Sequence, residues 1–126
     1  MEKYRGYRDL KVYQLAYQLA LDIFEITKHF PGEEKYSLTD QIRRSSRSVC
    51  ANLREAWAKR RYIAHFISKL TDCDGENSEV ETWLDFAKCC QYITSSEFEE
   101  LIEKNIRVGQ MLGNMMTKAE SFCKNN

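Results

Sequence analysis

The residues best suited to chemistry in this chain are basic side chains between positions 43 and 61. Each residue of an α-helix advances by about 100°, so Arg43, Arg47, Arg54 and Arg61 would emerge within about 40° of one another. At about 1.5 Å per residue, this stripe would extend over about 27 Å. Arginines in such a row suit the phosphates of RNA or DNA and would not read base sequence. The same pattern is also typical of a solvated helix face.

The charge of the chain is balanced overall but unevenly distributed. Nineteen basic residues stand against nineteen acidic ones, a net charge of zero. Residues 41–62 hold seven basic residues and one acidic residue, whereas residues 72–103 hold ten acidic residues and one basic residue. The basic region could present a surface to a nucleic acid, or the two regions could neutralise one another within a bundle or between subunits. The candidate nucleic-acid-binding residues are Arg43, Arg44, Arg47, Arg54, Lys59, Arg60 and Arg61.

Two other groups imitate metal sites incompletely. Asp72, Asp74, Gly75 and Glu81 match four positions of a calcium-binding loop, but Leu70 stands where its first carboxylate is required. His29 and His65 lack companions at metal-ligand spacing, so we expect histidines at a helix end or on the surface. We therefore expect no metal.

The chain also lacks a recognisable catalytic set. Cys89 and Cys90 would point about 100° apart on a helix, which favours burial over joint chelation. The sequence contains no Glu-x-x-His pair for a di-iron bundle, no phosphate loop, no nucleophile elbow and no cysteine near a histidine by helical spacing. We expect neither enzymatic activity nor a cofactor.

Composition predicts an all-α protein. One proline and five glycines in 126 residues favour long uninterrupted helices, and 43% hydrophobic residues are enough for the core of one domain spanning 1–126. No apolar run approaches the length of a membrane span. Five cysteines without a C-x-x-C spacing indicate reduced, mostly buried thiols. We expect a soluble cytoplasmic protein that does not enter a membrane.

Apolar spacing predicts four helices that position these residues. The first runs from about residue 9 to residue 30, and Pro31 and Gly32 end it. The second runs from 38 to about 59, with Ser37 and Asp40 resembling a capping box. The third covers 63–91 as one helix despite poor helix formers at 72–78, and the fourth begins at 95 or 96 with Glu99 as a cap signal. Short connections predict an antiparallel up-down-up-down four-helix bundle.

The aromatic residues are better explained by packing than by base stacking. Most lie on or beside the apolar seams, so we interpret them as core and interface anchors. A second apolar line, Tyr13, Tyr17, Ala20 and Phe24, makes the first helix broader than one neighbour requires and could face another subunit. Tyr4, Tyr7 and Tyr62 lie next to basic residues and are exceptions worth testing.

The pattern FP-x-x-E-x-Y-x-L-x-x-QIRR-x-x-x-SV-x-x-N, from Phe30 to Asn52, resembles a bacterial four-helix-bundle family associated with intervening sequences of large-subunit ribosomal RNA genes. Residues 10–20 and 78–87 also resemble its first and third helices. The resemblance implies an antiparallel four-helix bundle that assembles as a homopentamer. Relatives include the accessory protein of diversity-generating retroelements, which implies RNA or DNA and a reverse transcriptase as partners. Arg43, Arg44 and Arg47 match the basic part of the motif, while the other four basic residues rest on position alone.

Two functions follow from these observations. The first is a non-enzymatic nucleic-acid-binding or ribonucleoprotein accessory subunit, in which a homo-oligomer multiplies the basic stripe. The second is a structural or protein-interaction module, whose arginines form salt bridges with acidic surfaces of neighbouring subunits and bind no nucleic acid.

Overall fold

The computed structural model describes residues 4–123, which form helices and turns without a strand. Four helices are long: α1 (Lys11–Thr27), α2 (Leu38–Ala58), α3 (Ile63–Cys89) and α4 (Ser95–Thr117). A short helix α5 (Ala119–Phe122) follows, and the 3-10 turns η1 (Tyr7–Asp9) and η2 (Gly32–Glu34) precede α1 and α2. The all-α prediction is confirmed.

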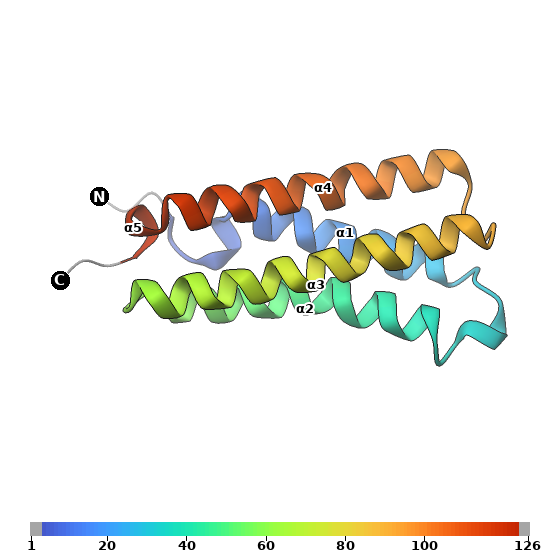
Figure 1. The fold of residues 1–126 in the computed structure, drawn as a ribbon, viewed down its shortest axis with the longest axis horizontal. Helices are drawn as coiled ribbons and strands as arrows, with labels where there is room; N and C mark the ends of the chain where they lie inside the picture. The colour runs from blue at the N-terminus through green and yellow to red at the C-terminus, as the bar shows by residue number, and fades with distance from the viewer. Residues whose placement is uncertain (1–3, 124–126) are drawn as a thin grey trace.

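The long helices form a bundle in which each packs against two neighbours. α1 and α3 each pack against α2 and α4, so α2 lies diagonally across from α4. The connections over residues 28–37 and 90–94 lie at one end of the bundle (Figure 1). The connection over 59–62 and both ends of the described chain lie at the other end.

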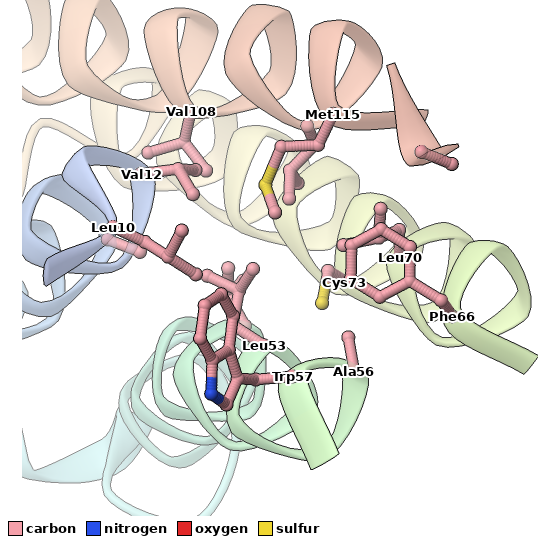
Figure 2. Packing of buried hydrophobic residues seen from close by; sticks show 14 of the residues in the cluster. Leu10, Val12, Leu53, Ala56, Trp57, Phe66, Leu70, Cys73, Val108 and Met115 are labelled. Atoms are coloured by element: carbon pink, nitrogen blue, oxygen red, sulfur yellow. The ribbon is translucent and has the colours of Figure 1, made fainter. Parts of the chain in front are cut away.

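The core consists of two apolar clusters stacked along the bundle axis. The first lies near the chain ends, where side chains from all four long helices point toward one another (Figure 2). The second lies toward the opposite end and includes Leu19, Ile42, Val80 and Leu101. The predicted seams are largely confirmed, since Ile42, Leu70 and Val108 are each 0% exposed. The third helix was predicted to reach residue 91, but α3 ends at Cys89 and Gln91 is exposed.

A buried amide pair separates the two clusters. Asn77 of α3 and Asn105 of α4 are 5% and 1% exposed. The Asn77 amide donates to the main-chain oxygen of Asn105 at 2.9 Å. The Asn105 amide donates to the main-chain oxygen of Asn77 at 2.8 Å and to its side-chain oxygen at 3.0 Å. Asn77 lies in the segment of poor helix formers, yet α3 is continuous through it, which confirms the prediction of one long helix.

The N-cap of α2 is at the predicted residue, but neither predicted capping box forms. Ser37 is the N-cap of α2 but makes no side-chain capping bond. Glu34 accepts instead from the Leu38 amide at 3.2 Å and from the Ser37 and Tyr92 hydroxyls. These hydrogen bonds from Ser37, Tyr92 and Leu38 lower the pKa of Glu34. At α4, Thr94 and Glu97 form the capping box instead of Ser95 or Ser96 with Glu99.

The cysteine and histidine predictions have mixed outcomes. All five cysteines are free thiols, and Cys73 and Cys123 are buried as expected. Cys89 and Cys90 are exposed, so the expectation of burial is wrong for them, because they fall on the outer side of the end of α3. His29 and His65 are exposed near helix ends, as predicted.

The end of α3 carries backbone strain at Gln91. Its φ is 63°, a left-handed conformation that is costly for residues with a Cβ. The Tyr92 amide donates to the Ala87 oxygen and the Gln91 amide to the Lys88 oxygen, both characteristic of a Schellman motif. Glycine usually occupies this position because it adopts positive φ without a steric penalty.

Gln91→Gly is therefore expected to stabilise the protein by about 1 kcal/mol. The substitution removes the penalty of the left-handed conformation, and this gain exceeds the entropic cost of the greater freedom of glycine in the unfolded chain. Urea denaturation at fixed protein concentration measures the change. Gln110→Gly is the matched control, because Gln110 is exposed inside α4 and should lose about 1 kcal/mol. Equal destabilisation by both substitutions would contradict the strain argument.

Candidate nucleic-acid interface

Helix α2 positions three of the predicted arginines on one face. It is unbroken from Leu38 to Ala58, and its core side buries Ile42, Val49 and Leu53. Arg43, Arg47 and Arg54 lie on the opposite side of the helical cylinder, separated by four and seven residues. The helix therefore holds these guanidinium groups in one row next to α1.

Arg43 is the most firmly held of the three. Its Nε donates to the Thr27 hydroxyl at 2.8 Å, and a terminal nitrogen donates to the Phe24 oxygen at 3.5 Å. Its guanidinium carbon lies 4.7 Å from the centre of the Phe24 ring. The cation thus reaches the C-terminal turn of α1, where main-chain oxygens favour positive charge. Arg43 is half-buried and fixes the position of the row against α1.

Arg47 and Arg54 are exposed and lie over aromatic rings. The guanidinium carbon of Arg47 is 5.5 Å from the Phe24 ring centre, and that of Arg54 is 4.6 Å from the Tyr7 ring centre. Such contacts contribute about 0.5–1 kcal/mol at exposed sites and leave the charge uncompensated. Over residues 4–123, neither arginine forms a salt bridge with a carboxylate.

Arg44 differs from its neighbours because it is already paired. Its Nε lies 2.9 Å from Asp40, and both side chains are substantially exposed. An exposed ion pair of this kind is weak and is screened by salt. Arg44 also lies about 100° around the helix from Arg43, although it lines the same surface hollow as Arg43 and Arg47.

The last three predicted residues lie beyond the end of α2. Lys59 is its C-cap, and Arg60 and Arg61 belong to the turn before α3, so the predicted alignment of Arg61 is wrong. Arg60 stacks 3.5 Å from the Trp57 ring centre and donates to the Trp57 oxygen at 2.8 Å. Arg61 is exposed beside Tyr62. The aligned row therefore ends at Arg54 and is about 16 Å long instead of about 27 Å.

The basic and acidic regions do not neutralise one another within the described part of the chain. Of the seven candidate residues, Arg44 alone forms a salt bridge there, and its partner comes from α2 itself. Lys69 of α3 connects Glu55 and Asp72 at 3.0 and 3.4 Å, and Lys104 of α4 pairs with Asp22 of α1. The acidic residues of α3 and α4 therefore leave the arginine row available.

Sequence reasoning missed the residues beneath the arginines. Tyr7 was noted for its basic neighbours, but Phe24 was assigned to a subunit-facing line and Thr27 was not considered. Contact between these residues and α2 depends on how the helices pack. Within residues 4–123, no three histidine, cysteine or acidic side chains gather as metal ligands, and no helix is long and apolar enough to cross a membrane.

The family profile described as 23S rRNA-intervening sequence protein matches residues 8–114, which include all four long helices up to the last turn of α4. The chain belongs to this family. A similar solved structure is the crystal structure of a protein of unknown function from the S23 ribosomal protein family of Bacteroides thetaiotaomicron. It is 29% identical, covers 84% of this chain and 95% of its own, and superposes with a TM-score of 0.77. No protein of curated function matches the chain.

The family match includes every candidate basic residue, whereas the structure divides them into three groups. Arg43, Arg47 and Arg54 form the aligned row, Arg44 is paired within α2, and residues 59–61 follow the end of that helix. In this 23S rRNA-intervening sequence protein, the aligned row is the strongest candidate site.

Proposed function

We propose that this protein is a non-enzymatic nucleic-acid-binding or ribonucleoprotein accessory subunit of a homo-oligomer. The observation that carries the proposal is the row of Arg43, Arg47 and Arg54, whose charges are held by aromatic rings and main-chain oxygens instead of carboxylates. A cation held in this way stays available to a phosphate. The row contacts the nucleic acid backbone and does not read base sequence. The family's association with ribosomal RNA intervening sequences supports RNA or DNA as the partner.

The proposal includes assembly with further copies of the chain, with the pentamer that the family resemblance implies. One row of three arginines binds weakly, and several rigidly held copies would bind a long RNA much more tightly. The antiparallel up-down-up-down order predicted from sequence belongs to this proposal, and the alternating ends of the connections support it. In that order, the arginine row of each copy lies along the side of its own four-helix bundle.

An exposed aromatic hollow supports the assembly part of the proposal. Tyr36 and Phe86 are 84% and 53% exposed, and they line a hollow of about 410 Å³ with Leu38 and Trp83. The Trp83 indole N–H is buried and has no hydrogen-bond acceptor within the described chain. A second copy of the chain that packs into the hollow would cover its exposed aromatic rings. The same feature favours the second candidate function, a protein-interaction module.

Salt dependence of RNA binding tests the nucleic-acid proposal. Raising salt from 50 to 200 mM is expected to weaken binding of a labelled structured RNA by at least about 20-fold, because the three phosphate contacts of even one row release about two counterions from a single-stranded segment. Fluorescence anisotropy measures the affinity, and light scattering on the same samples measures the oligomer mass. If RNA is not bound at 50 mM salt while the oligomer is intact, the protein-interaction module is correct instead.

A further inference from the structure

The surface beside the arginine row carries a ladder of tyrosine rings. The rings of Tyr7 and Tyr13 have centres 5.0 Å apart and are nearly perpendicular, and those of Tyr13 and Tyr17 have centres 6.0 Å apart. Tyr13 and Tyr17 are one helical turn apart on α1, which explains why their rings adjoin. Tyr17 is 51% exposed, so part of its ring is available to a ligand.

The ladder continues into a hollow between α1 and α2. This hollow has a volume of about 380 Å³ and is lined by Tyr17, Ala20, Leu21, Phe24, Arg47 and Cys50. Leu21 is 46% exposed there and adds apolar surface to the hollow. Burial raises the pKa of the Cys50 thiol to about 11, so the thiol is neutral and adds no charge to the hollow.

Guanidinium groups lie at both ends of this aromatic surface. Arg54 lies over Tyr7, the first ring of the ladder, and Arg47 lines the hollow beyond Tyr17. The surface thus alternates flat apolar rings with uncompensated positive charge. Proteins that bind single-stranded nucleic acids combine the same two elements, aromatic rings for the bases and a basic groove for the backbone.

Duplexes cannot use such a surface fully. Their bases are stacked on each other, so an aromatic ring gains no open base face and the arginines gain phosphates alone. Unpaired nucleotides offer both phosphates and open base faces. Exposed aromatic rings beside basic side chains therefore favour single strands over double strands without distinguishing among bases.

The tyrosine ladder and the adjoining hollow together form a groove between α1 and α2. We propose that this α1–α2 groove binds unpaired nucleotides, with bases stacking on Tyr17 and in the hollow and phosphates contacting Arg47 and Arg54. This inference rests on the proposed nucleic-acid function and specifies its ligand as single-stranded RNA or DNA. Charge complementarity favours this occupant over an apolar helix of another protein, which would leave both guanidinium groups facing a surface without phosphates.

Competition between single and double strands tests the inference. Anisotropy with a labelled twelve-nucleotide uridine strand and with a duplex of the same length is expected to show at least ~10-fold tighter binding of the strand, since each stacked base contributes a factor of this order. Tyr17→Ala should remove most of that preference and leave duplex binding unchanged. Tyr17→Phe should retain it, because the ring remains. Ile106→Ala is the matched control, since Ile106 is 48% exposed on α4, outside both this groove and the hollow around Trp83.

The alternative outcomes separate this inference from the proposed function. Equal affinity for strand and duplex, unchanged by Tyr17→Ala, would overturn the inference and leave a phosphate-binding surface in place. A smaller oligomer after Tyr17→Ala, seen by light scattering, would show that a second copy of the chain occupies the groove. If neither nucleic acid binds, the proposed function fails together with the inference.

Discussion

A protein carrying Arg47→Glu and Arg54→Glu is expected to bind structured RNA at least ~100-fold more weakly than the unchanged protein, because two phosphate contacts become repulsive. The slope of the logarithm of the affinity against the logarithm of the salt concentration should also become shallower, by about one for each lost phosphate contact. Both side chains are exposed and make no salt bridge over residues 4–123, so the fold should survive. Circular dichroism checks the fold, and anisotropy measures the affinity.

A charge-matched control separates a local contact from an effect of net charge. Arg107 and Lys118 are exposed, at α4 and just after it, and α4 lies diagonally across the bundle from α2. Arg107→Glu with Lys118→Glu changes the net charge by the same amount and should weaken RNA binding by less than ~5-fold, through long-range repulsion screened by salt. Equal losses in the two double variants would show that the row is not the site. A smaller oligomer for the α2 variant would instead favour intersubunit salt bridges.

The interior of the bundle is predictable because it depends on local periodicity. Residues such as Ile42, Leu70 and Val108 recur on one side of their helices, and burying that side is the dominant source of stability. The same reasoning predicted an unbroken α3 through the poor helix formers around Asn77. It did not identify Asn105, because a polar residue interrupts an apolar pattern without indicating what it will contact. Its partner lies twenty-eight residues away on another helix.

Helix ends and the candidate site are less predictable because tertiary contacts determine them. The cap of α2 comes from Glu34 in the preceding turn, which the Tyr92 hydroxyl also contacts from the other connection at that end. Arg61 was aligned on the assumption of a helix that in fact ends at Ala58. Helix geometry predicted the side of α2 on which Arg47 lies. It did not predict the contact of Arg47 with the Phe24 ring, because the spacing of residues in α2 does not identify which residue of α1 lies opposite.

Asn105→Leu is expected to destabilise the protein by about 2–4 kcal/mol, because it leaves the Asn77 side-chain oxygen buried without its donor. At this chain length the loss corresponds to a fall in Tm of about 10 °C. Urea denaturation at fixed protein concentration measures it. Asn114→Leu is the control, because Asn114 is exposed on the same helix and should change stability by less than about 0.5 kcal/mol.

The double variant Asn77→Leu with Asn105→Leu tests why the single change is costly. Leucine has the same branching as asparagine, so the pair can fill the space without leaving a buried polar group unpaired, and the double variant should be more stable than Asn105→Leu alone. Each asparagine lies between apolar residues of its own helix, with Cys73 and Val80 on either side of Asn77. A shift of α3 against α4 would bring both amides against apolar side chains, so the native pair opposes it. The single variant Asn77→Leu completes the comparison. If the loss of stability in the double variant equals the sum of the losses in Asn77→Leu and Asn105→Leu, the two amides act independently, and packing alone sets how these helices align.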